Sequence, residues 1–413
     1  RHYTLPLAAL ETPHPGRFLT GFYAAVTQLL LTHATPGDLE QFCLPLLRDL
    51  QALQDASPRE SDRFCAAMRK VTGVVRACVT ERAFQTVYDM LSPAAFAAME
   101  RFLAGNGEDA ATSVTAFRLL EELGNNRKGR FVGCEVSATP VLFFRGAAGL
   151  AGSYLHRLAE WRARVPRQTP AYPQAALKTL RVLLVGLTRI LEGNFVSFGA
   201  MLFYHDDCVL RLLTALAAVL APLELSDLAM APKLMHAVFD FLRALFASNM
   251  LIVAALPRDL FPFFCRLLID AIACDDELAV KSAAAAIDAL ATFMYTNSRS
   301  QLETYGKVLQ LVGDPQAFWS PVFQELFNAV LFSSLGAQWA LSRPLLSVYL
   351  TYEKSLGDYF AYLQNQCAPE KHDKLNSVYM EIEQLSDRSL DAMSRDSFSM
   401  NLSKWRRQLL EVV

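Results

Sequence analysis

The segment Thr139–Leu158, TPVLFFRGAAGLAGSYLHRL, decides between two kinds of fold for this chain. Its apolar run VLFF, followed by glycines at 146, 149 and 152, has the outline of a β-strand, a phosphate-binding loop and a helix. The glycine spacing is G-x-x-G-x-x-G, whereas a dinucleotide loop needs G-x-G-x-x-G and a mononucleotide loop needs Lys and Ser or Thr after its last glycine. Thr139-Pro140 is instead typical of a helix start. We therefore predict one helix from about Pro140, with small residues where a neighbour packs closely.

Helical periodicity extends through most of the chain. Apolar residues recur every three or four positions, which is the spacing of one helix face. Two of the clearest examples are Leu177, Leu180, Leu184, Leu187 and Leu191, and Val209, Leu212, Leu213, Leu216 and Leu220. No convincing series of alternating strands appears, so there is no parallel sheet to carry a nucleotide-binding loop. The prediction is an all-α protein.

Short breakers separate the predicted helices, among them Pro36-Gly37, Ser92-Pro93, Gly313-Asp314-Pro315 and Ser342-Arg343-Pro344. They define about sixteen helices, or about eight pairs of roughly 40 to 47 residues, the size of HEAT or armadillo repeats. We predict one continuous HEAT-like array over residues 1–413, a right-handed superhelix of antiparallel helix pairs, with 162–173 as a candidate internal linker. A globular all-α domain is the alternative. Even breaker spacing and the lack of a long linker favour the solenoid.

Charge and cysteine usage narrow the classes of partner and compartment. The 413 residues carry a net charge of -2, which gives no broad electrostatic reason to expect nucleic acid or an anionic membrane as partner. The eight cysteines include no C-x-x-C pair and no zinc-finger spacing with histidine. Most lie in apolar segments, which suits a reducing compartment.

Two features near the start of the chain concern targeting. The stretch Phe18–Gly37 lacks formal charge over about the length of a membrane span. Its threonines, glutamine and histidine predict an amphipathic buried helix instead, with no membrane insertion. The chain opens at Arg1 without an initiator Met or a signal-peptide pattern, which predicts that it is part of a longer protein.

Three segments resemble exportin 7 and its relatives, the Ran-binding proteins 16 and 17, within the importin-β superfamily. They are EGNFVSFGAMLFYHDDCVLRLLTAL from Glu192, QWALSRPLLSVYLTYEKSLGDY from Gln338, and APEKHDKLNSVYMEIEQLSDRSLDAMSRDSFSMNLSKWRRQLLEV from Ala368. Weaker matches, FLTGFYAAVTQLL and SVTAFRLLEELGNNRKGRF, precede them in the same order. The resemblance is to the C-terminal half of the family and covers nearly the whole chain. The chain departs from the pattern in its first sixteen residues, at 162–173, at 297–315 and at Ser333–Ala337.

This resemblance implies a HEAT-repeat nuclear transport receptor that is not an enzyme and needs no cofactor. Such receptors bind cargo together with Ran-GTP in the nucleus, pass the pore through phenylalanine-glycine nucleoporins, and release cargo when GTP is hydrolysed. Shuttling between nucleus and cytoplasm is therefore implied. The family's main Ran-binding arch lies in N-terminal repeats, and the resemblance implies that this chain lacks them. The alternative is a general helical-repeat scaffold for cytoplasmic assemblies, without Ran dependence. Such a scaffold would have no reason to contain the sequence segments that resemble the exportin 7 family.

Basic residues at breakers are the candidates for partner contacts. Arg127, Lys128 and Arg130 form a compact basic loop, and Arg162, Arg164 and Arg167 form another. Each loop would raise the rate and specificity of association with an acidic surface of cargo or Ran. The alternative is that both loops are solvated turns without a partner. Arg343 is a further candidate, but holding an inter-helix turn through exposed carbonyls is the favoured role for it.

No catalytic or metal site is predicted. The set His205, Asp206 and Asp207 is interpreted as a helix start, because acidic residues favour the first turn. The remaining histidines are scattered, with no nucleophile fixed beside any of them. The aromatic residues Phe195, Phe198, Phe203 and Tyr204 are predicted to pack in the core and not to form nucleoporin pockets.

Overall fold

The computed structural model describes residues 16–33, 36–126, 129–131, 137–166, 171–332, 338–385 and 388–412. Within these ranges the regular structure consists of twenty α-helices and the short 3-10 helix Pro369–Lys371, with no β-strand. The all-α prediction is confirmed. Twenty helices replace the roughly sixteen expected, in part because α8, α10 and α12 have only five or six residues, too few for a periodic pattern.

The chain divides into two compact units that meet between Pro222 and Leu223. Each unit is built from sequentially packed helices, which is consistent with a helical-repeat solenoid. The continuous array over residues 1–413 and its right-handed superhelix stay predictions.

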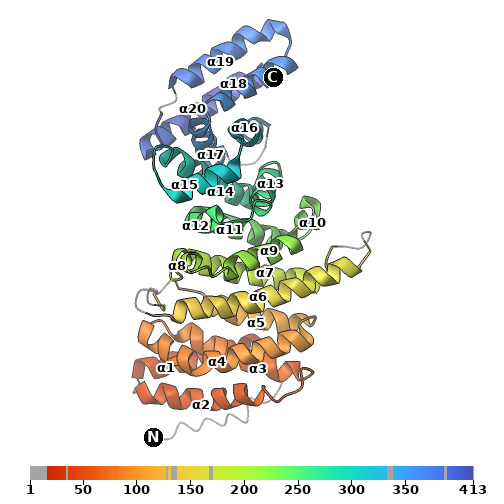
Figure 1. The fold of residues 1–413 in the computed structure, drawn as a ribbon, viewed down its shortest axis with the longest axis vertical. Coiled ribbons are helices and arrows are strands. Elements are labelled where there is room, and N and C mark those ends of the chain that lie inside the picture. The colour runs from red at the N-terminus through yellow and green to blue at the C-terminus, as the bar shows by residue number, and fades with distance from the viewer. Residues whose placement is uncertain are drawn as a thin grey trace. The chain divides into compact units, whose positions relative to one another are not determined.

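Two layers of helices make up the first unit (Figure 1). In each layer, every helix packs on the next one along. One layer contains α1 (Gly16–His33), α3 (Ser61–Ala77), α5 (Ala110–Leu123) and α7 (Gln174–Glu192). The other contains α2 (Pro36–Ala52), α4 (Glu81–Asn106), α6 (Thr139–Arg164) and α9 (Cys208–Leu220), with the short α8 (Phe198–Phe203) before α9.

The core of the first unit follows the periodic faces that the sequence predicts. On α7, Leu180, Leu184, Leu187 and Leu191 are buried, and on α9 all five predicted apolar positions are buried. Cys43, Cys65 and Cys78 are free thiols inside this core. Burial raises the pKa of the Cys43 thiol to about 12, so it stays protonated and packs as a small apolar group.

The segment Thr139–Leu158 lies entirely within α6, a helix of 26 residues. The single-helix prediction is therefore confirmed, and the strand and phosphate loop are excluded. The cap differs from expectation: Ser137 Oγ accepts the Thr139 N–H at 3.1 Å, and Ala138 is the N-cap residue. A Cβ on Gly146 would lie 2.8 Å from the ring of Phe96, whereas Gly149 and Gly152 have nothing within 4 Å. Close packing against a neighbour therefore applies to Gly146 alone among the three.

The second unit also has two layers (Figure 1). In one layer α11 (Pro232–Ser248), α14 (Glu277–Thr296), α17 (Gln338–Thr351) and α20 (Ala392–Leu410) pack in that order. In the other, α13 (Leu260–Ile272), α16 (Pro315–Phe332), α18 (Lys354–Gln366) and α19 (His372–Leu385) do the same. The remaining short helices are α10 (Leu225–Ala229), which packs on α11, and α12 (Met250–Ala254), which packs on α15 (Glu303–Val312).

The helix α14 is the central element of the second unit. By length and composition it could cross a membrane, but half of its apolar stretch is buried, and it packs on both α11 and α17. Polar contacts join it to its neighbours: Ser282 donates to Asp240 of α11 at 2.7 Å, and Arg395 of α20 pairs with Asp288 at 3.0 Å. Trp405 on α20 is fully buried.

Two of the predicted helix breakers are wrong. Pro93 lies inside α4 and Pro344 lies inside α17, so neither separates two helices. A proline inside a helix removes one backbone hydrogen bond and strains the preceding turn. The flanking residues offset this cost by burial: after Pro344, Leu345 is 0% and Leu346 is 1% exposed. The sequence places Leu345 and Leu346 directly after Pro344 and predicts that they begin a helix and insert into the preceding repeat. Their burial is confirmed, but the helix begins before them, at Gln338.

Substituting the glycines of α6 separates helix propensity from packing. Gly149→Ala should stabilise the protein by up to about 1 kcal/mol, because alanine is the better helix former and the new methyl group meets open space. Gly146→Ala gains the same propensity but must displace the Phe96 ring, so it should be clearly less stable than Gly149→Ala. Chemical denaturation of both variants is the measurement. Equal stability would show that the contact between α6 and Phe96 is loose.

Truncating Leu346 should weaken the second unit. Leu346→Ala is expected to lower the free energy of unfolding by about 2 to 5 kcal/mol, because it leaves a cavity in the core. Arg343→Ala, on the exposed side of the same helix, is the matched control and should change it by less than about 0.5 kcal/mol. Hydrogen exchange should accelerate first in α17 and the helices packed on it. Unchanged exchange beyond Arg343 in Leu346→Ala would argue against a core position.

Candidate functional site: an arginine-rich groove

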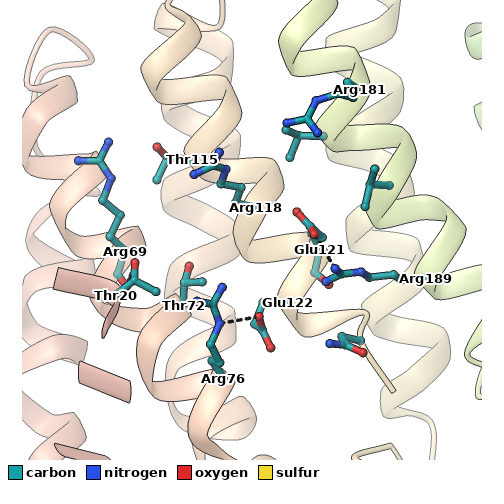
Figure 2. Close-up of a pocket in the computed structure, with 13 residues that line it drawn as sticks. Thr20, Arg69, Thr72, Arg76, Thr115, Arg118, Glu121, Glu122, Arg181 and Arg189 are labelled. Carbon is teal, nitrogen blue, oxygen red and sulfur yellow. Dashed lines mark hydrogen bonds and ion pairs between the residues drawn. The ribbon is translucent and has the colours of Figure 1, made fainter. Parts of the chain in front are cut away.

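A groove with a volume of about 810 Å³ runs across α3, α5 and α7 in the first unit (Figure 2). Its charged lining consists of five arginines and two glutamates, a difference of three positive charges. We call this feature the arginine groove. Its lining residues are Thr20, Arg69, Thr72, Arg76, Thr115, Arg118, Glu121, Glu122, Asn125, Arg181, Val182, Val185 and Arg189.

Helix periodicity places these arginines on one face. Arg69 and Arg76 are seven residues apart on α3, and Arg181 and Arg189 are eight apart on α7, so each pair is separated by about two helical turns. The opposite faces of these helices are apolar and buried; on α3 they include Phe64, Met68 and Val75. Burial of the apolar faces therefore turns the arginines outward along three neighbouring helices.

Close contacts hold the helices beneath the groove in register. A Cβ on Gly73 of α3 would lie 2.5 Å from the Thr20 carbonyl oxygen of α1, so only glycine allows this approach. Between α5 and α7, the buried hydroxyls of Ser113 and Thr179 share a hydrogen bond of 2.9 Å. These contacts fix the spacing of the arginines above them.

Two of the groove arginines are neutralised by the glutamates of α5. Arg76 Nε lies 3.1 Å from Glu122 Oε2, and Arg189 Nη2 lies 2.9 Å from Glu121 Oε1 (Figure 2). Glu122 also binds the buried Arg130, whose Nη1 is 3.2 Å from Oε1 and 3.0 Å from the Glu122 carbonyl oxygen. The side chains of Glu122 and Arg130 are 8% and 4% exposed, so this pair is shielded from water.

The other three arginines face the groove without a carboxylate. Arg69 on α3, Arg118 on α5 and Arg181 on α7 form a row across the three helices (Figure 2). Within the described part of the chain, their guanidinium groups make no ion pair or side-chain hydrogen bond. Guanidinium groups that have no carboxylate partner within the protein are suited to binding carboxylates or phosphates of a partner molecule.

Only part of the sequence-predicted basic loop lies within the described residues. There the structure corrects the role predicted for Arg130. Arg127 and Lys128 lie outside the described residues. Arg130 is 3% exposed and binds Glu122 and the Arg76 carbonyl oxygen, so it stabilises the fold and is not open to a partner. Sequence reasoning missed this because the acidic partner, Glu122, comes from the preceding helix.

The remaining predicted contact residues are scattered and do not form one site. Arg162 lies in the last turn of α6, where Nη1 donates to the Val165 carbonyl oxygen at 3.2 Å. Arg164 is exposed and weakly paired with Glu160 at 3.7 Å. Arg343 is exposed on α17, inside a helix and not at an inter-helix turn. The role of these three residues in partner binding stays a proposal, and Arg167 is outside the described residues.

The set His205, Asp206 and Asp207 is a helix start. Asp206 Oδ2 binds Arg145 Nε at 2.6 Å, and Oδ1 accepts the Cys208 N–H at 3.1 Å. Burial acts to raise the pKa of Asp206, but the hydrogen bonds from Arg145 and Cys208 outweigh it and hold the pKa below its usual value. Asp207 is the N-cap residue of α9 and pairs with Arg211 at 3.0 Å. Both carboxylates therefore stabilise the fold at the start of α9.

The prediction for the aromatic cluster is right for two residues and wrong for two. Phe195 and Phe198 are buried, and Phe195 stacks on Phe131 with ring centroids 4.5 Å apart. Phe203 and Tyr204 are each 77% exposed at the end of α8. They were missed because α8 ends after one and a half turns, so its last residues leave the buried face.

The arginine groove itself was not found from the sequence. Its signal is the spacing of seven and eight residues between arginines on two neighbouring helices. That spacing is visible in the sequence, but the side-by-side placement of α3, α5 and α7 is not.

Comparison with known proteins gives distant similarity along nearly the whole chain. Ran-binding protein 17 of Mus musculus is 24% identical over 427 residues, covering 98% of this chain and 39% of that protein. Exportin-7-B of Xenopus laevis is 23% identical, covering 95% of this chain and 37% of that protein. Ran-binding protein 16 of Drosophila melanogaster is 26% identical over 74% of this chain and 28% of its own length. No protein-family model matches.

The chain is a distant homologue of the exportin 7 and Ran-binding protein 16/17 family. The resemblance inferred from the sequence is thereby confirmed. The chain spans less than two-fifths of the length of these relatives and aligns with a segment of each.

Removing the carboxylate of Glu122 should destabilise the first unit. Glu122→Ala leaves the buried Arg130 charge without its carboxylate, which typically costs about 3 to 5 kcal/mol. Glu121→Ala is the matched control on the adjacent position. Its pair with Arg189 is half-exposed, with side chains 22% and 30% exposed, so its loss should cost at most about 1 kcal/mol. Urea denaturation measures the free energy of unfolding of both variants. Equal losses would show that the buried pair contributes no more stability than the half-exposed pair.

Proposed function

We propose that this chain is part of a nuclear export receptor that binds protein cargo cooperatively with Ran-GTP and carries it through the nuclear pore. The observation that carries the proposal is the alignment of at least 95% of the chain with proteins named exportin 7 and Ran-binding protein 17. In this function the protein passes the pore through phenylalanine-glycine nucleoporins and shuttles between nucleus and cytoplasm. It catalyses no reaction and uses no cofactor.

The stacked helices of each unit support a binding role. Repeats in such stacks touch only their neighbours, so the stack can flex and change its curvature. Two ligands that both favour one curvature then bind cooperatively, without contact between them. Ran-GTP would bind mainly through repeats outside this segment. The segment would contribute cargo contacts and the flexibility that couples the two sites.

Charge favours acidic partner surfaces. The arginine groove carries three more positive than negative charges in a protein whose overall charge is -2. A local excess of this kind raises the association rate and specificity for a complementary acidic patch. Arg127, Lys128, Arg162, Arg164 and Arg343 remain proposed auxiliary contacts.

Cooperativity with Ran tests the proposal. The full-length protein should retain nuclear proteins more tightly with GTP-locked Ran than with GDP-bound Ran or none. A coupling of about 1 to 3 kcal/mol, or roughly 5- to 150-fold in affinity, is the usual range. The measurement is affinity capture from nuclear extract, followed by titration of a captured cargo with and without Ran-GTP. The same bound proteins at the same affinity in all lanes would support a scaffold without Ran dependence.

A further inference from the structure

We infer that the arginine groove binds an extended acidic segment of a partner protein, with a carboxylate at every third residue. The site consists of the row of Arg69, Arg118 and Arg181, one from each of three successive helices. The inference concerns direct binding to this segment. It rests on the proposed function only in assigning the occupant to a protein partner, and it does not require Ran.

The spacing of the row matches an extended chain. Packed helices lie about 8 to 10 Å apart, so guanidinium groups on neighbouring helices repeat at roughly that interval. An extended peptide in the polyproline II conformation has three residues per turn and advances about 3.1 Å per residue, so side chains three apart share one face and repeat every ~9 Å. Carboxylates at positions i, i+3 and i+6 of such a segment would meet Arg69, Arg118 and Arg181 in turn. A helical peptide rises only about 1.5 Å per residue, so its i and i+6 positions are about 9 Å apart, roughly half the length of the row.

The other edge of the groove restricts where the segment can lie. There Arg76 and Arg189 already bind Glu122 and Glu121. A second line of carboxylates along this edge would face two glutamates and gain little. Charge therefore guides the acidic segment to the open row of arginines.

The length of the row limits the kind of ligand. A compact anion such as inorganic phosphate is too small to reach guanidinium groups on three successive helices at once.

Peptide binding to the 413-residue chain tests the inference. The probe is a fluorescent synthetic peptide with glutamate at every third residue and serine or glycine between. A permuted peptide of the same composition has its three glutamates consecutive, and a third has glutamine in their place. Fluorescence anisotropy should show binding of the spaced peptide at least about fivefold tighter than the permuted one, and no measurable binding of the glutamine peptide. A difference of tenfold corresponds to about 1.4 kcal/mol.

Two arginine variants locate the site. Arg118→Gln removes the middle guanidinium and should lower affinity for the spaced peptide about tenfold, with less salt dependence. Arg82→Gln makes the same charge change at an exposed position on α4, in the other layer, and should lower affinity less than about twofold. Circular dichroism of both variants should match the parent chain, since both positions are exposed.

The outcomes are distinguishable from those of the Ran experiment. Equal affinity for spaced and permuted peptides, or an equal effect of Arg118→Gln and Arg82→Gln, would overturn the inference and show non-specific attraction only. Tighter binding of inorganic phosphate or tripolyphosphate than of the spaced peptide would assign the groove to a small anion instead. The proposed receptor function would survive any of these results, because Ran-dependent cargo capture is measured separately.

Discussion

The buried pair between Glu122 and Arg130 is the constraint on which the first unit's binding face depends. Arg130 also donates to the Arg76 carbonyl oxygen at 3.2 Å and lies over the Phe84 ring at 5.8 Å. One guanidinium therefore joins the ends of α3 and α5 to α4. Ordering these groups away from water is costly unless the charges and donors are paired. The pairing fixes the helix ends that carry the groove, and it keeps Glu122 in place to neutralise Arg76.

The division of the groove into a paired and an open row follows from this arrangement. Glu121 and Glu122 occupy adjacent positions on α5, and they point to Arg189 on α7 and to Arg76 on α3. Arg118 stands one turn earlier on α5, and within the described residues it forms no ion pair with either glutamate, since these bind Arg189 and Arg76. The same helix thus neutralises one edge of the groove and leaves the other edge positively charged. Exposed charges of this kind add specificity and association rate to partner binding more than they add affinity.

Local sequence rules fail in this protein where tertiary packing is strong. Proline at 93 and 344 does not end a helix, because the apolar residues around it are buried on both sides. Three regularly spaced glycines in α6 have different roles, since only Gly146 meets a neighbouring ring. The exposure of Phe203 and Tyr204 depends on where a six-residue helix ends. For Gly146 the deciding neighbour, Phe96, lies fifty residues earlier in the sequence.

The sequence alone determined the all-α class, the apolar faces of the long helices, the core role of Leu345 and Leu346, and the family. These follow from periodicity and from strings of residues, which are local properties of the chain. The arginine groove, the burial of Arg130 and the open row at Arg69, Arg118 and Arg181 were decided only by the tertiary structure. The reason is that each depends on which helices pack side by side. Arg69 and Arg181 are more than a hundred residues apart in sequence, and only the stacking of α3, α5 and α7 brings them to one face.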